Sequence, residues 1–182
     1  MSAPSLAPIT TPSNGTVPTP GNLFTLDNRV FCCYLFWATV LVAKMLLMSL
    51  LTALQRFRYK LLALVPLKLR RKIFPNEEDL FFKNIEVQFD DPHVERVRRA
   101  HRNDMENILP YFIMALIYIS TNPNQDVACN LFRVASLARI VHTLVYAVYP
   151  VPQPSRILAF GTMLLITFYM AAVVALRTLS FI

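Results

Sequence analysis

Residues 95–111 read E-R-V-R-R-A-H-R-N-D-M-E-N-I-L-P-Y, and in this stretch a dense run of charge passes directly into an apolar segment. In a helix of 3.6 residues per turn, two cations, an amide and a carboxylate fall on one stripe: Arg99, Arg102, Asn103 and Glu106. Unpaired charge at the mouth of a membrane helix is costly, so the stripe predicts partners for these side chains. A solvated helix end with intrahelical ion pairs accounts for the spacing equally well, and other features of the chain decide between the two.

The composition predicts an all-α integral membrane protein. The 182 residues are 55% hydrophobic, with a mean hydropathy of +0.44. Helices long enough to cross the roughly 30 Å hydrocarbon core predict a four-transmembrane-helix bundle with spans at about 30–55, 95–120, 127–149 and 156–177. Residues 1–28 are rich in Pro, Ser and Thr and predict a disordered tail, so the membrane domain comprises residues 29–182.

The cysteines indicate neither a disulfide framework nor a metal site. Cys32, Cys33 and Cys129 lie in apolar surroundings without a metal-ligand spacing, so we expect them to be packing residues. A Ser/His/Asp triad, a Cys/His pair and a phosphate-binding loop would each need residues that the chain does not place together. We therefore expect the reactive group to belong to a ligand.

Ionisable residues inside the predicted spans are candidates for function. Lys44 is the only charge in Val30–Leu54, and we expect it to face the other helices, with snorkelling to the interface as the alternative. Arg139, His142 and Tyr146 share one face of the third span. A structural hydrogen bond is the alternative role for His142, and a polar site or a buried ion pair is expected for Arg139.

The fourth span opens with a cation. Ser155 is the predicted N-cap, and Arg156 in the first turn opposes the helix dipole, either as a snorkelling anchor or as a cation held to meet an anion. Arg56 ends the first span on the same side of the membrane, so these side chains can converge with the stripe on one pocket. Because arginines outnumber acids there, the pocket predicts a ligand with carboxylates for the guanidinium groups and an ammonium for Glu106.

Several long motifs resemble those of the MAPEG family, the membrane-associated proteins in eicosanoid and glutathione metabolism. They are V-E-R-V-R-R-A-H-R-N-D-M-E-N-I-L-P-Y-F at 94–112, F-P-N-E-E-D at 74–79, A-R-I-V-H-T-L-V-Y at 138–146 and P-V-P-Q-P-S-R at 150–156. The resemblance covers nearly everything after residue 30. It is greatest for the microsomal glutathione transferases, a subfamily that includes the microsomal prostaglandin E synthases.

The resemblance implies a homotrimer of four-helix protomers, with glutathione bound as co-substrate between neighbouring subunits. By the same resemblance, the glutathione-binding residues come from the first three helices: Arg56, Arg99, Arg102, Asn103, Glu106, Arg139, His142 and Tyr146. Arg156 matches the catalytic arginine that stabilises the glutathione thiolate. The pocket expected from the residues alone asks for two carboxylates, an ammonium and a ligand-borne reactive group, and glutathione has all of these.

The implied activity is detoxification: conjugation of the glutathione thiolate to apolar electrophiles, with glutathione-dependent reduction of lipid hydroperoxides as a further activity. The alternatives are a prostaglandin E synthase-type isomerase, a non-enzymatic lipid-presenting member of the family and, from the charge alone, an RNA or membrane-surface binder. Ile157 and Phe160 favour the transferase, because the prostaglandin synthases carry Ser and Tyr there. The expected location is the endoplasmic reticulum, with the mitochondrial outer membrane as the second choice.

The basic residues expected outside the membrane predict the topology. Twelve lie within residues 56–102 and Arg156 lies on the same side, against only Arg29 and Arg177 on the other. By the positive-inside rule the 56–94 loop is cytosolic, and the tail with its Asn14-Gly15-Thr16 glycosylation pattern is luminal. Protease added to sealed microsomes is therefore expected to cut the loop and spare the tail, and cleavage of the tail alone would overturn this topology.

Overall fold

A computed structural model describes residues 23–61 and 92–182, apart from the side chains of residues 56–61. Its elements are α1 (Arg29–Leu61), α2 (Pro92–Ser120), α3 (Gln125–Thr143) continued by the π-helix η4 (Leu144–Val148), and α4 (Ser155–Thr178) continued by the 3₁₀ turn η5 (Leu179–Phe181). The prediction of an all-α fold with four long helices is confirmed. The predictions for the tail before residue 23, for the F-P-N-E-E-D motif and for the Arg56 side chain lie outside the described part of the chain.

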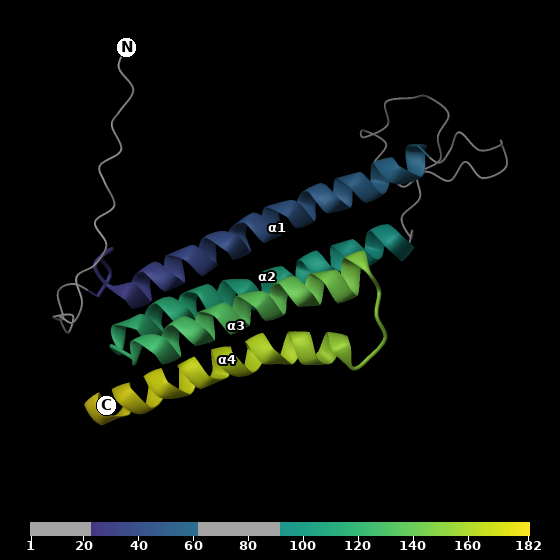
Figure 1. Cartoon of the computed structure of the whole chain (residues 1–182). Helices are drawn as coiled ribbons and strands as arrows, with labels where there is room; N and C mark the ends of the chain where they lie inside the picture. The colour runs from purple at the N-terminus through teal and green to yellow at the C-terminus, as the bar shows by residue number, and fades with distance from the viewer. Residues whose placement is uncertain (1–22, 62–91) are drawn as a thin grey trace, which may run out of the picture.

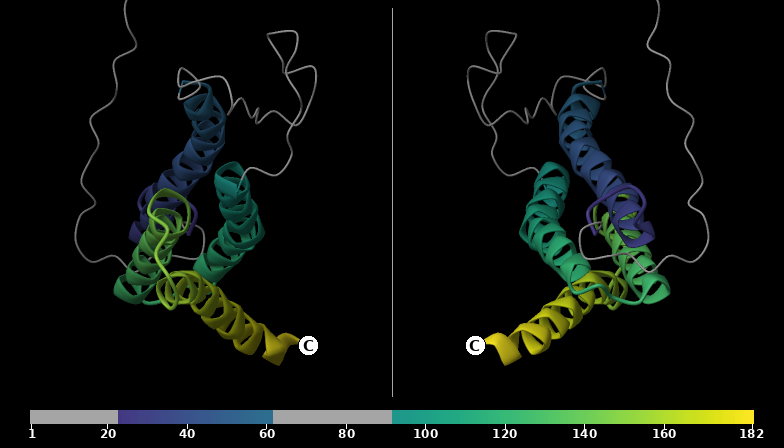
Figure 2. Two further views of the ribbon diagram at one scale, coloured as in Figure 1. Left: turned by 90° about the vertical axis from the view of Figure 1, so that its right-hand side faces the viewer. Right: turned by 90° about the vertical axis from the view of Figure 1, so that its left-hand side faces the viewer.

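The four helices alternate in direction, so α1 and α3 end where α2 and α4 begin (Figure 1). We call the end where α1 finishes and α2 begins the loop end, and the opposite end, where Thr121–Asn124 joins α2 to α3, the turn end. Both α1 and α4 pack against α2 and α3. Figure 2 shows α1 and α4 on opposite sides of the bundle, which leaves α2 and α3 facing each other across its diagonal.

Three helical segments of the described chain are long and apolar enough to cross a membrane: Arg29–Gln55, Gln125–Val148 and Ser155–Phe181. Large apolar side chains point outward from them, among them Leu46, Leu50 and Phe168, as expected for surfaces that meet lipid. The charged first turns of α2 keep it below the hydropathy of the other three. Its crossing, and hence a four-span topology, stays a prediction.

The core follows the helical period of the sequence. On α2 the buried positions include Val97, Ala100, Ile108 and Tyr111, which recur every three or four residues on one face. Ile108 and Tyr111 lie in a cluster with residues such as Leu41 of α1, Phe132 of α3 and Met163 of α4, and the other two lie in a second cluster with Met48 of α1 and Ala147 of η4. Because this face of α2 is fixed against the core, the stripe with Arg99 and Glu106 is directed elsewhere.

The two ends of the helices differ partly from the sequence prediction. At the turn end, Asn122 adopts a φ of 48°, and the Asn124 side chain caps α3 by accepting from the N–H groups of Asp126 and Val127 at 3.0 and 3.2 Å. The prediction that Ser155 caps α4 is wrong, since Pro154 occupies the N-cap position. The Ser155 hydroxyl instead donates to the Pro152 carbonyl at 2.8 Å, which closes the link before the helix.

The expectation that all three cysteines are packing residues is also wrong. Cys33 of α1 and Cys129 of α3 form a disulfide near the turn end, and Cys32 is the free thiol. Helices α1 and α3 pack together there with the two Cα atoms 5.5 Å apart, a separation that suits a disulfide. The sequence spacing of 96 residues gave no sign of this contact, because only the packing of the helices creates it.

The disulfide predicts how the three cysteines of the chain react. In protein denatured without reductant, alkylation is expected to label one cysteine, Cys32, and after reduction it should label all three. Peptide mass spectrometry should find Cys33 linked to Cys129 before reduction. Labelling of three cysteines in the unreduced protein would contradict the disulfide.

Candidate functional site

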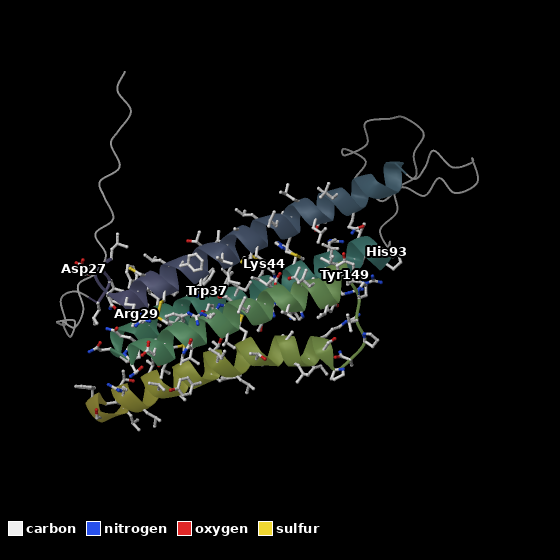
Figure 3. All side chains as sticks on the ribbon, viewed as in Figure 1. Asp27, Arg29, Trp37, Lys44, His93 and Tyr149 are labelled. Carbon is white, nitrogen blue, oxygen red and sulfur yellow. A yellow bond between two sulfur atoms is a disulfide. The ribbon has the colours of Figure 1, made fainter. Side chains whose placement is uncertain are left out.

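A cleft of about 490 Å³ opens at the loop end of the bundle. It lies between the first half of α2, the end of α3 with η4, and the start of α4, near the labelled His93 and Tyr149 in Figure 3. Its walls combine charged, aromatic and apolar side chains: Arg99, Arg102, Asn103, Glu106, His142, Tyr146, Gln153, Arg156, Ile157 and Phe160. The structure therefore brings together most of the site residues predicted from the sequence.

The α2 wall of the cleft is the charged stripe of the opening sequence. Arg99, Arg102 and Glu106 are exposed and Asn103 is half-buried, as a helix period of 3.6 dictates once the opposite face is in the core. Together with Arg156 from α4, the cleft holds three guanidinium groups and one carboxylate. This excess of positive charge attracts an anion, while the carboxylate offers one place for a cationic group.

A stack of three side chains forms the opposite wall. The His142 and Tyr146 rings lie nearly parallel, with centroids 5.5 Å apart and 28° between their planes. On the Tyr146 ring lies the guanidinium of Arg156, whose Cζ is 5.0 Å from the centroid. This cation–π contact holds Arg156 at the cleft and is worth roughly 0.5–2 kcal/mol. Arg156 is thus directed inward, where a freely snorkelling anchor would extend toward the interface.

Tyr146, the middle side chain of the stack, comes from a π-helix that the sequence did not predict. In η4, the wider turn ends where the Tyr149 N–H donates to the Leu144 carbonyl at 2.7 Å. The following Val151 N–H donates to the Val145 carbonyl at 2.9 Å, so the chain leaves the helix with both carbonyls satisfied. Single π-turns of this kind occur often at functional sites.

Arg139 does not line the cleft, although it was predicted among the binding residues. It is fully buried and donates from Nη2 to Oδ1 of Asp104, and from the same nitrogen to Oδ1 of Asn103 at 2.9 Å. Lys44 of α1 donates to the other Asp104 oxygen. The structure therefore confirms the prediction that Lys44 faces the bundle, and it realises the ion-pair alternative for Arg139; Figure 3 shows Lys44 well inside the helical region.

Sequence reasoning missed Asp104 and Gln153. The signal for Asp104 was present, because this carboxylate falls on the α2 face that otherwise carries Val97, Ala100 and Ile108. A charged side chain on a core face needs buried partners of opposite charge, and Lys44 and Arg139 are the cations inside the predicted spans that needed an acidic partner. Gln153 lies in the link before α4, and its Oε1 accepts from the Ile157 N–H at 3.3 Å, which satisfies part of the first turn of α4.

Comparisons with known proteins agree with the resemblance in the sequence. The sequence profile described as the MAPEG family matches residues 34–176. Microsomal glutathione S-transferase 1 of Homo sapiens is 40% identical over 140 residues, which cover 74% of this chain and 82% of that protein. Prostaglandin E synthase of Mus musculus is 35% identical over 131 residues, covering 71% of this chain and 77% of that protein.

The buried carboxylate predicts a large effect of one isosteric substitution. Asp104→Asn removes the charge that Lys44 and Arg139 share, and breaking a buried ion pair typically costs about 3–5 kcal/mol. The matched control is Asp126→Asn, because Asp126 pairs with Arg29 at 3.2 Å where both side chains are more than half exposed, and such pairs are worth about 1 kcal/mol or less. Unfolding in detergent should separate the two variants clearly, and equal losses would contradict the assignment.

Proposed function

The chain belongs to the MAPEG family, and on that premise we propose that it is a membrane glutathione transferase that joins the glutathione thiolate to apolar electrophiles. The observation that carries the proposal is the charge pattern of the cleft, with three guanidinium groups and one carboxylate among its walls. Glutathione has two carboxylates and one ammonium, which is the complementary set. Its thiol supplies the reactive group that the cleft itself lacks.

In this proposal the α2 stripe binds the charged ends of glutathione. Arg99 and Arg102 donate to the carboxylates, because a guanidinium presents its N–H groups in a fork that matches the two oxygens. Glu106 accepts from the ammonium. Asn103, His142 and Tyr146 add polar groups along the same cleft. Arg56, expected at the end of the first span, completes the proposed set.

Arg156 is proposed to stabilise the thiolate. A free thiol has a pKa of about 8.5, so only a few per cent is ionised at neutral pH, and the thiolate is the nucleophile. Lowering this pKa by about two units requires roughly 2.7 kcal/mol of preference for the anion. A guanidinium held on the Tyr146 ring inside a partly dry cleft can supply that preference.

The apolar part of the cleft suits the second substrate. Ile157 and Phe160 line the cleft on the α4 side, and Leu158, on the same turn of α4, is exposed on the outside of the bundle. An apolar electrophile can therefore reach the thiolate from the bilayer. A prostaglandin E synthase-type isomerase is the second candidate, supported by the similarity to that mouse enzyme, but Ile157 and Phe160 offer no hydroxyl to an endoperoxide. The same thiolate, with a second glutathione as reductant, would reduce lipid hydroperoxides.

The assembly and location belong to the same proposal. Arg99, Arg102 and Glu106 are exposed in a single chain, so a neighbouring subunit of a homotrimer would cover them and exclude water. All four helices would cross the membrane of the endoplasmic reticulum or the mitochondrial outer membrane. The loop end, with the cleft, would then face the cytosol, where glutathione is plentiful.

The proposed activity is tested with protein purified in detergent, glutathione and a chromogenic apolar electrophile such as 1-chloro-2,4-dinitrobenzene. We expect enzyme-dependent formation of the conjugate that saturates with glutathione. The transferase would be refuted by a wild-type protein that unfolds cooperatively, and is therefore folded, but neither forms the conjugate nor binds glutathione.

Arg156→Ala is predicted to separate binding from activation. The variant should still bind glutathione, but its bound thiol should titrate close to the free value, and turnover at neutral pH should fall with the thiolate fraction. The ultraviolet absorbance of the thiolate measures this directly as a function of pH. Arg177→Ala is the matched control, because Arg177 is at the other end of α4 and donates to the Thr121 carbonyl at 3.3 Å. A bound thiol pKa that stays low in Arg156→Ala would show that another cation activates the thiol.

A further inference from the structure

Arg139 contacts two consecutive side chains of α2 that point in different directions. Consecutive residues of a helix are about 100° apart around its axis, so Asp104 faces the core while Asn103 faces the cleft. One nitrogen of Arg139, Nη2, donates to Oδ1 of both residues. A buried group on α3 is thereby linked to a wall of the ligand cleft.

This contact fixes the orientation of the Asn103 amide. A guanidinium has only donors, so the atom of Asn103 that faces Arg139 must be its oxygen, Oδ1, at 2.9 Å from Nη2. The amide nitrogen is bonded to the same carbon and points away from Arg139. Asn103 lines the cleft, and among the described residues nothing accepts from this nitrogen, so its two N–H hydrogens can donate to a ligand.

Arg139 itself is held in one position. Arg139 and Asp104 are both 0% exposed, and the second oxygen of Asp104 is occupied by Lys44. Among the described residues, Nε and Nη1 of Arg139 have no hydrogen-bond partner, so its hydrogen bonds go only to Asn103 and Asp104. A fully buried guanidinium cannot give up the carboxylate without a large desolvation cost, so it cannot follow a movement of Asn103.

We propose that Arg139, held by Asp104, is a positioning residue that fixes Asn103 as a hydrogen-bond donor to a carboxylate of the anionic ligand. This inference rests on the proposed function, in which that ligand is glutathione. Arg139 acts from behind the cleft wall and does not touch the ligand. It follows that Asn103 contributes to affinity by donating, and that an acceptor at this position repels the ligand carboxylate.

The test replaces the proposed hydrogen-bond donor of the protein by an acceptor, and the proposed acceptor of the ligand by a donor. Asn103→Asp keeps an oxygen toward Arg139 and replaces the N–H groups with a second oxygen. We expect its glutathione affinity to fall roughly 10- to 100-fold, the scale of a lost charge-assisted hydrogen bond. One of the two monoamides of glutathione, in which a carboxylate becomes a carboxamide donor, should bind this variant better than glutathione does. Wild type should show the opposite preference.

Asn130→Asp is the matched control. Asn130 of α3 also accepts from an arginine, since Nη1 of Arg133 donates to its Oδ1 at 3.2 Å, but it does not line the cleft. This variant undergoes the same chemical change and should keep the wild-type affinity and the wild-type preference for glutathione over its amides. If Asn103→Asp, like wild type, still binds glutathione more tightly than either monoamide, the inference is overturned.

A double-mutant cycle with Asn103→Ala and Arg139→Lys covers the case in which Asn103→Asp does not fold. If Arg139 acts through Asn103, Arg139→Lys should weaken glutathione binding several-fold in the wild-type background and not further in the Asn103→Ala background. Equal losses in both backgrounds would overturn the inference. Wild-type protein that binds no glutathione at all would instead refute the proposed function, so the two failures are distinguishable.

Discussion

The ion pairs of Asp104 with Lys44 and Arg139 set the arrangement on which the rest of the structure depends. They join α1, α2 and α3 in the middle of the bundle, where both oxygens of the carboxylate are occupied. Although α2 and α3 face each other across the diagonal, the long Arg139 side chain of α3 reaches Asp104 of α2. Once Asp104 faces the core, the helical period places Arg102 and Glu106 on a different face, and the cleft follows from that rotation.

The two ends of the bundle have different physical roles. At the turn end, the Cys33–Cys129 disulfide joins α1 to α3, the Asn124 side chain caps α3, and the paired side chains of Arg29 and Asp126 are exposed. At the loop end, the cations of α2 and α4 converge on a cleft open enough to admit a ligand. The bundle is thus covalently joined at one end and has its charged cleft at the other.

The sequence predicted what depends on local periodicity and missed what depends on contacts between helices. The stripe of Arg99 and Glu106 and the four long helices follow from a period of 3.6 and from hydropathy. The Cys33–Cys129 bond and the ion pair of Arg139 with Asp104 require the packing, because each joins residues of two different helices. The Gln153 side chain that satisfies the start of α4 is a local contact with Ile157, four residues away, and it lies in a link without helical periodicity. The π-turn of η4 was missed for another reason, since its sequence is as compatible with an α-helix.

In the proposed complex, glutathione lies in the cleft with its sulfur directed at Arg156. This pose is tested by a structure of the full chain in a lipid nanodisc with glutathione sulfonate, a stable anionic analogue of the thiolate form. We expect the carboxylates at Arg99 and Arg102, the ammonium at Glu106 and the sulfonate within hydrogen-bond distance of the Arg156 guanidinium. A ligand bound elsewhere, or one in this cleft with its sulfonate away from Arg156, would contradict it.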